Sequence, residues 1–258
     1  MGDIQDVSVA RTTFAVITRN EEERIEGCLS AAAWADEVLV LDSCSVDRTV
    51  DICRKYTDRV YQKEFQSFPN QRNHALDLAT GDWVLFVDAD ERVTPELARE
   101  VQQAVERMDS PTVGYWIPRR NIIWGKWIKY GGWFPDHQLR LLRRDKSRYD
   151  ESRQVHELVI LQGSAGHLSQ PLIHYNYETV AQFLRKQSFY SEYEARTLFE
   201  NGVRARPWGP VLQSLREVNR RLLNLRGYRD GGHGLLLSIL LGYYQFVVYS
   251  KLLRMSRL

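Results

Sequence analysis

The sequence predicts an α/β fold, with a mostly parallel sheet flanked by helices and a helical C-terminal extension. Three observations lead to this prediction. Short apolar runs alternate with amphipathic segments through the first half of the chain, as expected for strands covered on both faces. Polar residues directly follow three of these runs. From Val180 onward the chain has helical periodicity, and it ends in a strongly apolar stretch.

Four apolar runs are the expected parallel strands: Phe14–Thr18, Val38–Leu41, Arg59–Tyr61 and Trp83–Val87. Helical periodicity predicts the helices between them, over Glu22–Trp34, Asp47–Tyr56 and Asn70–Ala79. A further helix begins at Thr94-Pro95, which supply an N-cap and a first-turn proline, and reaches about Met108. Because ligands of such sheets bind beyond the carboxyl ends of the strands, we expect a site at that edge.

The second half of the chain has a different pattern. Val113–Arg119 and Gln138–Arg143 are predicted strands, joined by the aromatic, glycine-rich segment Ile122–Pro135. Exposed Trp and Tyr side chains there would stack on sugar rings or lie at a lipid interface; alternatively they cover a hydrophobic edge. The apolar stretch Gly234–Tyr249 is shorter than the about 20 residues of a membrane span. We therefore expect an interfacial or re-entrant helix, with a buried core helix as the alternative.

Composition restricts the function classes. The chain has 258 residues, 43% hydrophobic and 26% charged, which is ordinary for a globular protein. A formal net charge of only +2 argues against nucleic acid as a partner. Cys28, Cys44 and Cys53 form neither a CxxC pair nor an even set, and no signal peptide precedes them. This usage indicates reduced cysteines in a cytosolic protein.

Positive charge is concentrated near the C-terminus. The arginines of this basic stretch are Arg204, Arg206, Arg216, Arg220, Arg221, Arg226 and Arg229. Such a stretch binds an acidic surface, such as anionic lipid or a phosphorylated glycan, or it forms a solvated helix face.

The most informative feature is Asp88-Ala89-Asp90, which follows the apolar run Trp83–Val87. On extended backbone, residues i and i+2 point to the same side, so both carboxylates would face the edge of the sheet. Two adjacent ionised carboxylates repel each other unless a cation lies between them or one is protonated. Mg²⁺ and Mn²⁺ bind such groups and complete their shell with water and phosphate oxygens. The alternative is that one aspartate caps a turn and the other is solvated. The buried strand before the pair favours a metal–diphosphate site.

Other enzyme classes fit the sequence less well. A nucleotidyltransferase of similar fold would carry a glycine-rich loop after the first strand, but no glycine occurs there before Gly27. A dehydrogenase would show G-x-G-x-x-G at the same place. A phosphatase with an aspartate nucleophile would have its paired aspartates after the first strand. The alternative outside enzymes is a catalytically inactive glycan- or lipid-binding protein.

Four segments resemble the inverting glycosyltransferases of family 2, which have the GT-A fold, and they occur in the family's order: Phe14–Glu22 (FAVITRNEE), Val38–Thr49 (VLVLDSCSVDRT), Asn70–Asn73 (NQRN) and Gly81–Asp90 (GDWVLFVDAD). Four later segments resemble the branch that builds the lipopolysaccharide inner core: Gly131-Gly132, Leu139–Arg143, Val155–Glu157 and His174-Tyr175. Typical activity in that branch is glucosyl transfer to a heptose.

The resemblance implies roles for individual residues. Thr18, Arg19, Asn20 and Glu21 would lie along the nucleotide of the donor. Asp42 would accept hydrogen bonds from the uracil or ribose. Arg72 would approach the diphosphate or the base.

The same resemblance assigns the paired aspartates to the donor and its metal. Asp88 would hold ribose or metal, and Asp90 would bind Mg²⁺ or Mn²⁺ directly. A metal that bridges the diphosphate stabilises the charge on the leaving nucleoside diphosphate.

An inverting transfer needs a general base that takes the proton of the acceptor hydroxyl. Family members use an acidic residue downstream of the paired aspartates, and two residues compete for this role here. Glu157 is the first choice because it follows a predicted strand and neighbours His156; Asp136 is the alternative. His156-Glu157 does not begin a zinc protease motif, because Ile160 stands where the second histidine should be. His167 and His174 are expected to be structural, although either could contact a phosphate.

These inferences combine into one functional hypothesis. Residues 1–178 would form a GT-A catalytic domain, with a nucleotide-sugar half over about 1–110 and an acceptor half over about 111–178. Residues 179–258 would form a helical, membrane-associated extension. The protein would transfer a hexose, glucose in the first instance, from a UDP-sugar to a lipid-linked saccharide such as the lipopolysaccharide inner core. It would work in the cytoplasm, peripherally on the anionic inner face of the cell membrane.

Overall fold

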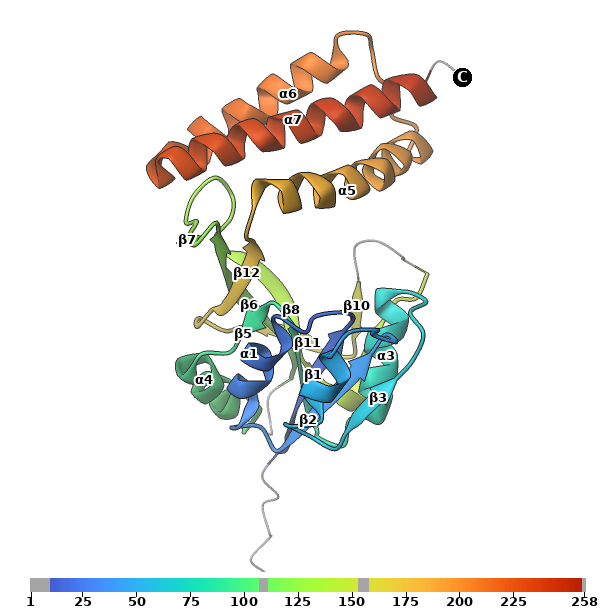
Figure 1. Cartoon of the computed structure of the whole chain (residues 1–258), viewed down its shortest axis with the longest axis vertical. Helices are drawn as coiled ribbons and strands as arrows, with labels where there is room; N and C mark the ends of the chain where they lie inside the picture. The colour runs from blue at the N-terminus through green and yellow to red at the C-terminus, as the bar shows by residue number, and fades with distance from the viewer. Residues whose placement is uncertain (1–9, 107–110, 153–157, 257–258) are drawn as a thin grey trace, which may run out of the picture. The chain divides into compact units, whose positions relative to one another are not determined.

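The computed structural model describes residues 10–106, 111–152 and 158–256, and the chain forms two compact units (Figure 1). The sheet unit comprises Met1–Arg119 and His137–His174. The helical unit comprises Arg120–Asp136 and Tyr175–Leu258. These units describe packing alone. The division into a donor half, an acceptor half and an extension concerns function and stays a prediction.

The first four strands form the parallel part of the sheet, as the apolar runs predict. They are β1 (Thr12–Thr18), β2 (Glu37–Asp42), β3 (Val60–Gln62) and β4 (Trp83–Asp88). β1 lies between β2 and β4 and is parallel to both, and β3 is parallel to β2. The α/β fold class with its parallel strands is therefore confirmed for this half of the sheet.

Beyond β4 the sheet is mixed, in the strand order β3-β2-β1-β4-β8-β6-β12-β5. The added strands are β5 (Glu91–Arg92), β6 (Thr112–Ile123), β8 (Asp136–Arg143), β11 (Ser164–His167) and β12 (Leu172–Tyr177). β8 is antiparallel to β4, β12 is antiparallel to β5, and β11 is parallel to β6. β9 (Ser147–Tyr149) and β10 (Val159–Leu161) form a separate antiparallel pair.

The first two helices are shorter than the periodicity predicts. They are α1 (Ile25–Leu29), which continues as a 3₁₀ turn over Ser30–Ala32, and α2 (Thr49–Cys53). Side chains accept hydrogen bonds from backbone N–H groups of the residues that precede these helices. Glu21 N–H donates to Thr49 Oγ1 (2.8 Å), and Arg48 N–H donates to the Glu22 carboxylate (3.1 Å).

The next two helices begin with side-chain caps. α3 (Phe68–Leu78) begins before its predicted start because Ser67 Oγ accepts from Asn70 N–H (3.3 Å). α4 (Pro95–Val105) begins after Thr94, whose Oγ1 accepts from Leu97 N–H (3.2 Å), as predicted. Residues 107–110, where its predicted end lies, are outside the described residues.

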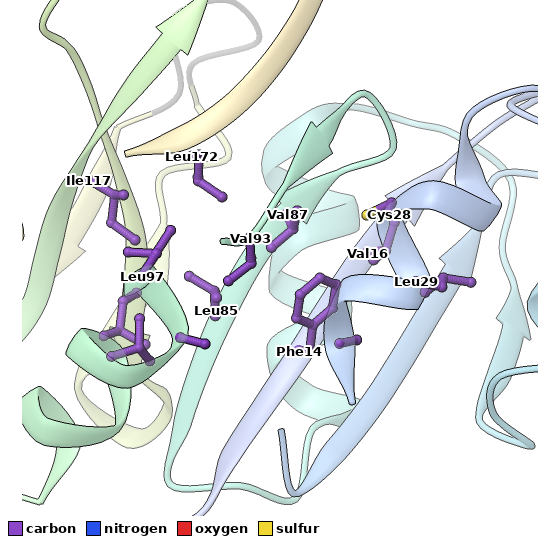
Figure 2. Close-up of a cluster of buried hydrophobic side chains, with 14 of the residues drawn as sticks. Phe14, Val16, Cys28, Leu29, Leu85, Val87, Val93, Leu97, Ile117 and Leu172 are labelled. Carbon is purple, nitrogen blue, oxygen red and sulfur yellow. The ribbon is translucent and has the colours of Figure 1, made fainter. Parts of the chain in front are cut away.

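The core of the sheet unit covers one face of the parallel strands (Figure 2). Side chains of β1 and β4, among them Phe14 and Leu85, pack with Cys28 of α1 and Leu97 of α4. Alternate residues of the same strands face a second cluster under α3. Burial on both faces explains why the strands are continuously apolar in sequence.

The helical unit contains three long helices, α5 (Val180–Glu200), α6 (Gly209–Asn219) and α7 (Gly232–Met255). α7 packs against both of the others (Figure 1). α7 has 24 residues and is long and apolar enough to cross a membrane, with a mean hydropathy of 1.4 over its apolar 18-residue window. The expectation that this stretch is too short for a span was therefore wrong, because the helix extends beyond Gly234–Tyr249 at both ends. Length and composition alone do not separate a span from a core helix, and 33% of the apolar window is buried.

The aromatic segment between the two predicted strands packs within the helical unit. β6 extends to Ile123, and β7 (Lys126–Trp127) pairs back on its end. Ile123 and Ile128 are buried in one cluster with Phe183 and Leu237, with Trp124 and Trp133 packed against it. The tryptophans are thus half-buried and cover a hydrophobic surface, which is the alternative that the sequence left open.

Candidate active site

The ends of β1, β2 and β4 lie side by side. In the parallel register Thr18 is paired with Asp42, and Ile17 with Asp88. The polar residues that follow the three strands therefore come to one edge of the sheet, as the sequence predicts. The physical reason is that parallel neighbours end in the same direction.

The turns after β1 and β2 are joined by hydrogen bonds. Asn20 N–H donates to Ser45 Oγ (2.8 Å), and Val46 N–H donates to Asn20 Oδ1 (2.9 Å). Asn20 and Cys44 both have left-handed backbone, with φ of 54° and 58°. Asparagine adopts this conformation more readily than most residues. The Thr18–Glu21 turn is therefore fixed by the turn that follows Asp42.

The Asp42 carboxylate is fully buried and organises its own turn. Its Oδ2 accepts from Ser45 N–H (2.8 Å) and from the Gln62 side chain (3.1 Å), and the Ser45 hydroxyl donates to its Oδ1. Bonds of this kind fix the direction of the carboxylate at the tip of β2. Its predicted contact with uracil or ribose stays a prediction.

Asp88 is held by two arginines. Arg72 donates to its Oδ1 (3.2 Å), and Arg140 binds both carboxylate oxygens. Burial alone would raise the pKa of the Asp88 carboxyl, but the Arg140 and Arg72 guanidinium groups outweigh it and hold that pKa well below its usual range. Asp88 is therefore ionised, and its charge is balanced by protein groups.

Arg72 lies in a different environment from the one expected of a diphosphate ligand. Its guanidinium lies near the rings of Phe86 (5.2 Å) and Tyr149 (5.7 Å), which contact each other edge to face, and only 4% of the residue is exposed. Little of its surface is open to a ligand. The structure shows an ion pair with Asp88 at 3.2 Å.

Glu91 extends this cluster of buried charges. It has no exposed surface, and its Oε1 lies 3.2 Å from Arg140 and 3.4 Å from Arg119. Its Oε2 accepts from Asp88 N–H (3.0 Å). Three guanidinium groups thus contact two carboxylates beside the tip of β4, and the neighbouring Asp90 adds a third carboxylate.

Asp90 lies beside a histidine. Its Oδ2 is 3.4 Å from His174 Nε2, and 19% and 7% of the two side chains are exposed. β4 ends at Asp88, so Asp90 lies in the turn before β5 and is not aligned with Asp88 by strand alternation. Antiparallel pairing of His174 with Glu91 brings β12 to this turn.

A carboxylate oxygen and an imidazole nitrogen side by side suit Mn²⁺ or a related divalent cation. Within the described ranges no group of three or more His, Cys, Asp or Glu residues could hold a metal. Asp90 and His174 would supply two ligands here, Asp88 is a further candidate, and phosphate oxygens and water would complete the shell. Sequence reasoning treated His174 as structural, because nothing in the local pattern places it opposite Asp90.

The family model for glycosyl transferase family 2 matches residues 13–166. The chain belongs to glycosyltransferase family 2. Membership in this family excludes the nucleotidyltransferase alternative and supports the predicted GT-A glycosyltransferase. The match agrees with the resemblance seen in the four N-terminal segments, all of which lie within residues 13–166.

This glycosyltransferase has relatives among named proteins. It is 27% identical over 252 residues to the lipopolysaccharide core biosynthesis glycosyltransferase LpsC of Rhizobium meliloti, with 92% of this chain and 90% of that protein covered. Mannosyl-3-phosphoglycerate synthase from Rubrobacter xylanophilus is 17% identical, with 75% of each chain covered and a TM-score of 0.49. Glucosyl-3-phosphoglycerate synthase from Mycobacterium tuberculosis, solved with Mn²⁺, UDP-glucose and phosphoglyceric acid, is 20% identical, with 43% and 44% covered and a TM-score of 0.39.

The remaining predicted site residues of the glycosyltransferase are Arg19, Glu21, Asp136 and Glu157. Arg19 is exposed, and Glu21 lies 3.7 Å from Arg24. Asp136 belongs to the helical unit, where its Oδ2 accepts from the Asn121 side chain (3.2 Å). Glu157 lies outside the described residues. The roles of these residues as donor ligands or as general base stay predictions.

Proposed function

We propose that this glycosyltransferase moves a hexose, glucose in the first instance, from a UDP-sugar to a lipid-linked saccharide at an anionic membrane surface, with inversion at the anomeric carbon. The observation that carries the donor half of the proposal is the pair Asp90–His174 at the tip of β4. It provides the ligand types of a divalent cation at the strand ends where nucleotides bind in α/β sheets.

The metal, Mg²⁺ or Mn²⁺, would be held by Asp90 and His174 and would supply electrophilic stabilisation of the leaving diphosphate. Asp88 acts on the donor from a fixed position. Arg72 and Arg140 restrict its rotation, so its carboxylate meets ribose or the metal without first losing conformational freedom. Arg72 is therefore proposed as a positioning residue for Asp88.

The acceptor half rests on general base catalysis. The base would lie within hydrogen-bond reach of the acceptor hydroxyl and take its proton as that oxygen attacks the anomeric carbon. Glu157 remains the first choice and Asp136 the alternative. Either carboxylate could do the chemistry.

The lipid-linked acceptor is supported by the named relative and by the helical unit. LpsC acts, by its name, in lipopolysaccharide core biosynthesis. The helical unit carries 16 Lys and Arg residues against seven Asp and Glu residues. It also exposes apolar side chains on α6 and α7, among them Leu215 (62%) and Ile239 (51%). Basic charge combined with exposed apolar residues suits the surface of an anionic membrane.

The donor half is tested by calorimetry of UDP binding with and without Mn²⁺. We expect Mn²⁺ to strengthen UDP binding in the full chain, and we expect Asp90→Ala and His174→Ala each to abolish that gain. His167→Ala is the matched control, because His167 stacks on Trp116 and contacts the ring of His137 edge to face instead. UDP binding that is indifferent to Mn²⁺, or a gain that survives in both variants, would refute the metal site.

Catalytic turnover provides a second test, measured as UDP release and as transfer to an acceptor. UDP release from UDP-glucose and Mn²⁺ should require Asp90. Glu157→Gln should lose transfer to a lipid-linked acceptor by about a hundredfold or more while UDP binding is unchanged. If Asp136→Asn shows this loss and Glu157→Gln does not, the base is Asp136.

A further inference from the structure

An apolar groove lies between α5 and α7, inside the helical unit. Its volume is about 360 Å³, and its walls include Phe183 and Leu184 of α5 and Leu240, Tyr244 and Val247 of α7. Nothing in the donor or acceptor chemistry uses it. A groove of this composition in contact with water leaves apolar surface uncovered, which favours an apolar occupant.

The groove continues into an exposed apolar stripe on α7. The stripe consists of Leu235, Leu236, Ile239, Tyr243 and Phe246, each at least 39% exposed. The spacing follows the helical repeat, so these side chains share one face of the helix. Tyr243 belongs to the stripe and also lines the groove. An occupant that enters the groove is therefore in contact with the surface that α7 would present to a membrane.

Charge at the groove favours an anionic occupant. Arg185 lines the groove and is exposed, and the helical unit as a whole has more than twice as many basic as acidic residues. A carboxylate or phosphate head group would be paired at Arg185 while its chain lies on the apolar wall.

The size of the groove suits a single hydrocarbon chain. Pockets of about 300–1,000 Å³ enclose most of a small ligand, so the volume of this groove, near the lower end of that range, suits one chain and not several. We propose that the groove between α5 and α7 binds one hydrocarbon chain of an anionic membrane lipid. The inference rests on the proposed work at a membrane and goes beyond it, because it assigns a discrete site for one chain.

The test uses the full chain in solution, without vesicles, and a dansyl-labelled undecanoic acid as the probe. We expect saturable binding at one site per chain. Val247→Trp and Leu240→Trp fill the groove and should weaken binding at least tenfold. Ile239→Trp is the matched control, because it adds the same side chain to the same helix outside the groove, and it should change binding less than twofold.

A second test varies the chain length and the head group of the lipid that competes with the probe. Unlabelled fatty acids that displace the probe should bind about fourfold more tightly for each added methylene, and the gain should stop once the chain fills the groove. Arg185→Gln should weaken fatty acids several-fold but leave the matching fatty alcohols unchanged.

Three results would overturn the proposal: binding that does not saturate, tryptophan variants that bind like the control, or affinity that keeps rising with chain length. If the groove instead joins two copies of the chain, the probe does not bind, and Val247→Trp abolishes a concentration-dependent dimer in light scattering. Mn²⁺-dependent UDP binding, measured on the same samples, reports the proposed donor chemistry separately. Loss of UDP binding would count against that chemistry and not against the lipid site.

Discussion

At the residue scale, the structure shows how a carboxylate pair at a strand tip is divided between two environments. Asp88 is enclosed by Arg72 and Arg140, and Asp90 faces His174. Removing one partner from a buried ion pair leaves an uncompensated charge, which costs far more than losing an exposed pair. Arg140 is 5% exposed and binds Asp88 and Glu91 together, so it is the residue on which this cluster depends most.

We therefore expect Arg140→Met to lower the free energy of unfolding by about 3–5 kcal/mol. Arg148→Met is the matched control: its pair with Asp77 is more than half exposed on both sides, and its loss should cost about 0–1 kcal/mol. Urea unfolding monitored by tryptophan fluorescence measures both. If the two changes lower the free energy of unfolding equally, the buried cluster contributes no more to stability than an exposed ion pair.

The same two proteins, wild type and Arg140→Met, should also differ in how their stability depends on pH. Because the pKa of Asp88 is depressed in the folded protein, its ion pairs contribute fully above the pKa of an unfolded aspartate, about 3.9, and are lost as the pH falls further. The wild type should thus lose more stability than Arg140→Met between about pH 6 and pH 3.

At the scale of elements, the site depends on the two turns that follow β1 and β2. They contain residues with positive φ, Asn20 and Cys44, and are joined by backbone-to-side-chain hydrogen bonds. The first N–H groups of a helix have no acceptor within it, and side chains accept from such groups just before α1 and α2. Shorter helices leave the backbone of Thr18–Glu21 beside the tip of β2, where the nucleotide is proposed to lie.

Asn20→Ala should lower the free energy of unfolding by about 1–2 kcal/mol, because it loses the acceptor of Val46 N–H and disfavours the left-handed backbone. Asn20→Gly keeps the conformation but not the acceptor, so its loss should be smaller. UDP binding should weaken in the same order. If glycine proves as harmful as alanine, the backbone conformation is not what asparagine provides.

At the scale of the whole molecule, charge is divided unequally between the two units. The sheet unit has 19 Lys and Arg residues against 26 Asp and Glu residues, whereas the helical unit has 16 against seven. The net charge of +2 conceals this division. An anionic surface attracts the helical unit and repels the sheet unit, which favours contact through the helices.

Flotation with vesicles tests this. The full chain should float with phosphatidylglycerol vesicles and not with phosphatidylcholine, and binding should weaken as added salt shortens the Debye length to about 3 Å at 1 M. Leu215→Glu and Leu236→Glu, at exposed positions of α6 and α7, should each reduce flotation severalfold. Alkaline carbonate should release a peripheral protein, whereas retention would indicate that α7 spans the bilayer.

The sequence by itself determined the parallel strands, the edge where they end, the paired aspartates at that edge and the family. Each of these features follows from short segments of the sequence: apolar runs buried on two faces, and the polar residues that follow them. The tertiary structure decided which side chains meet: Arg140 reaches Asp88 from 52 residues away, and His174 reaches Asp90 from β12. It also decided that the aromatic segment is half-buried within the helical unit. The physical reason is that periodicity reports burial and backbone conformation along one segment, whereas contacts between distant segments depend on strand order and register, which no local pattern encodes.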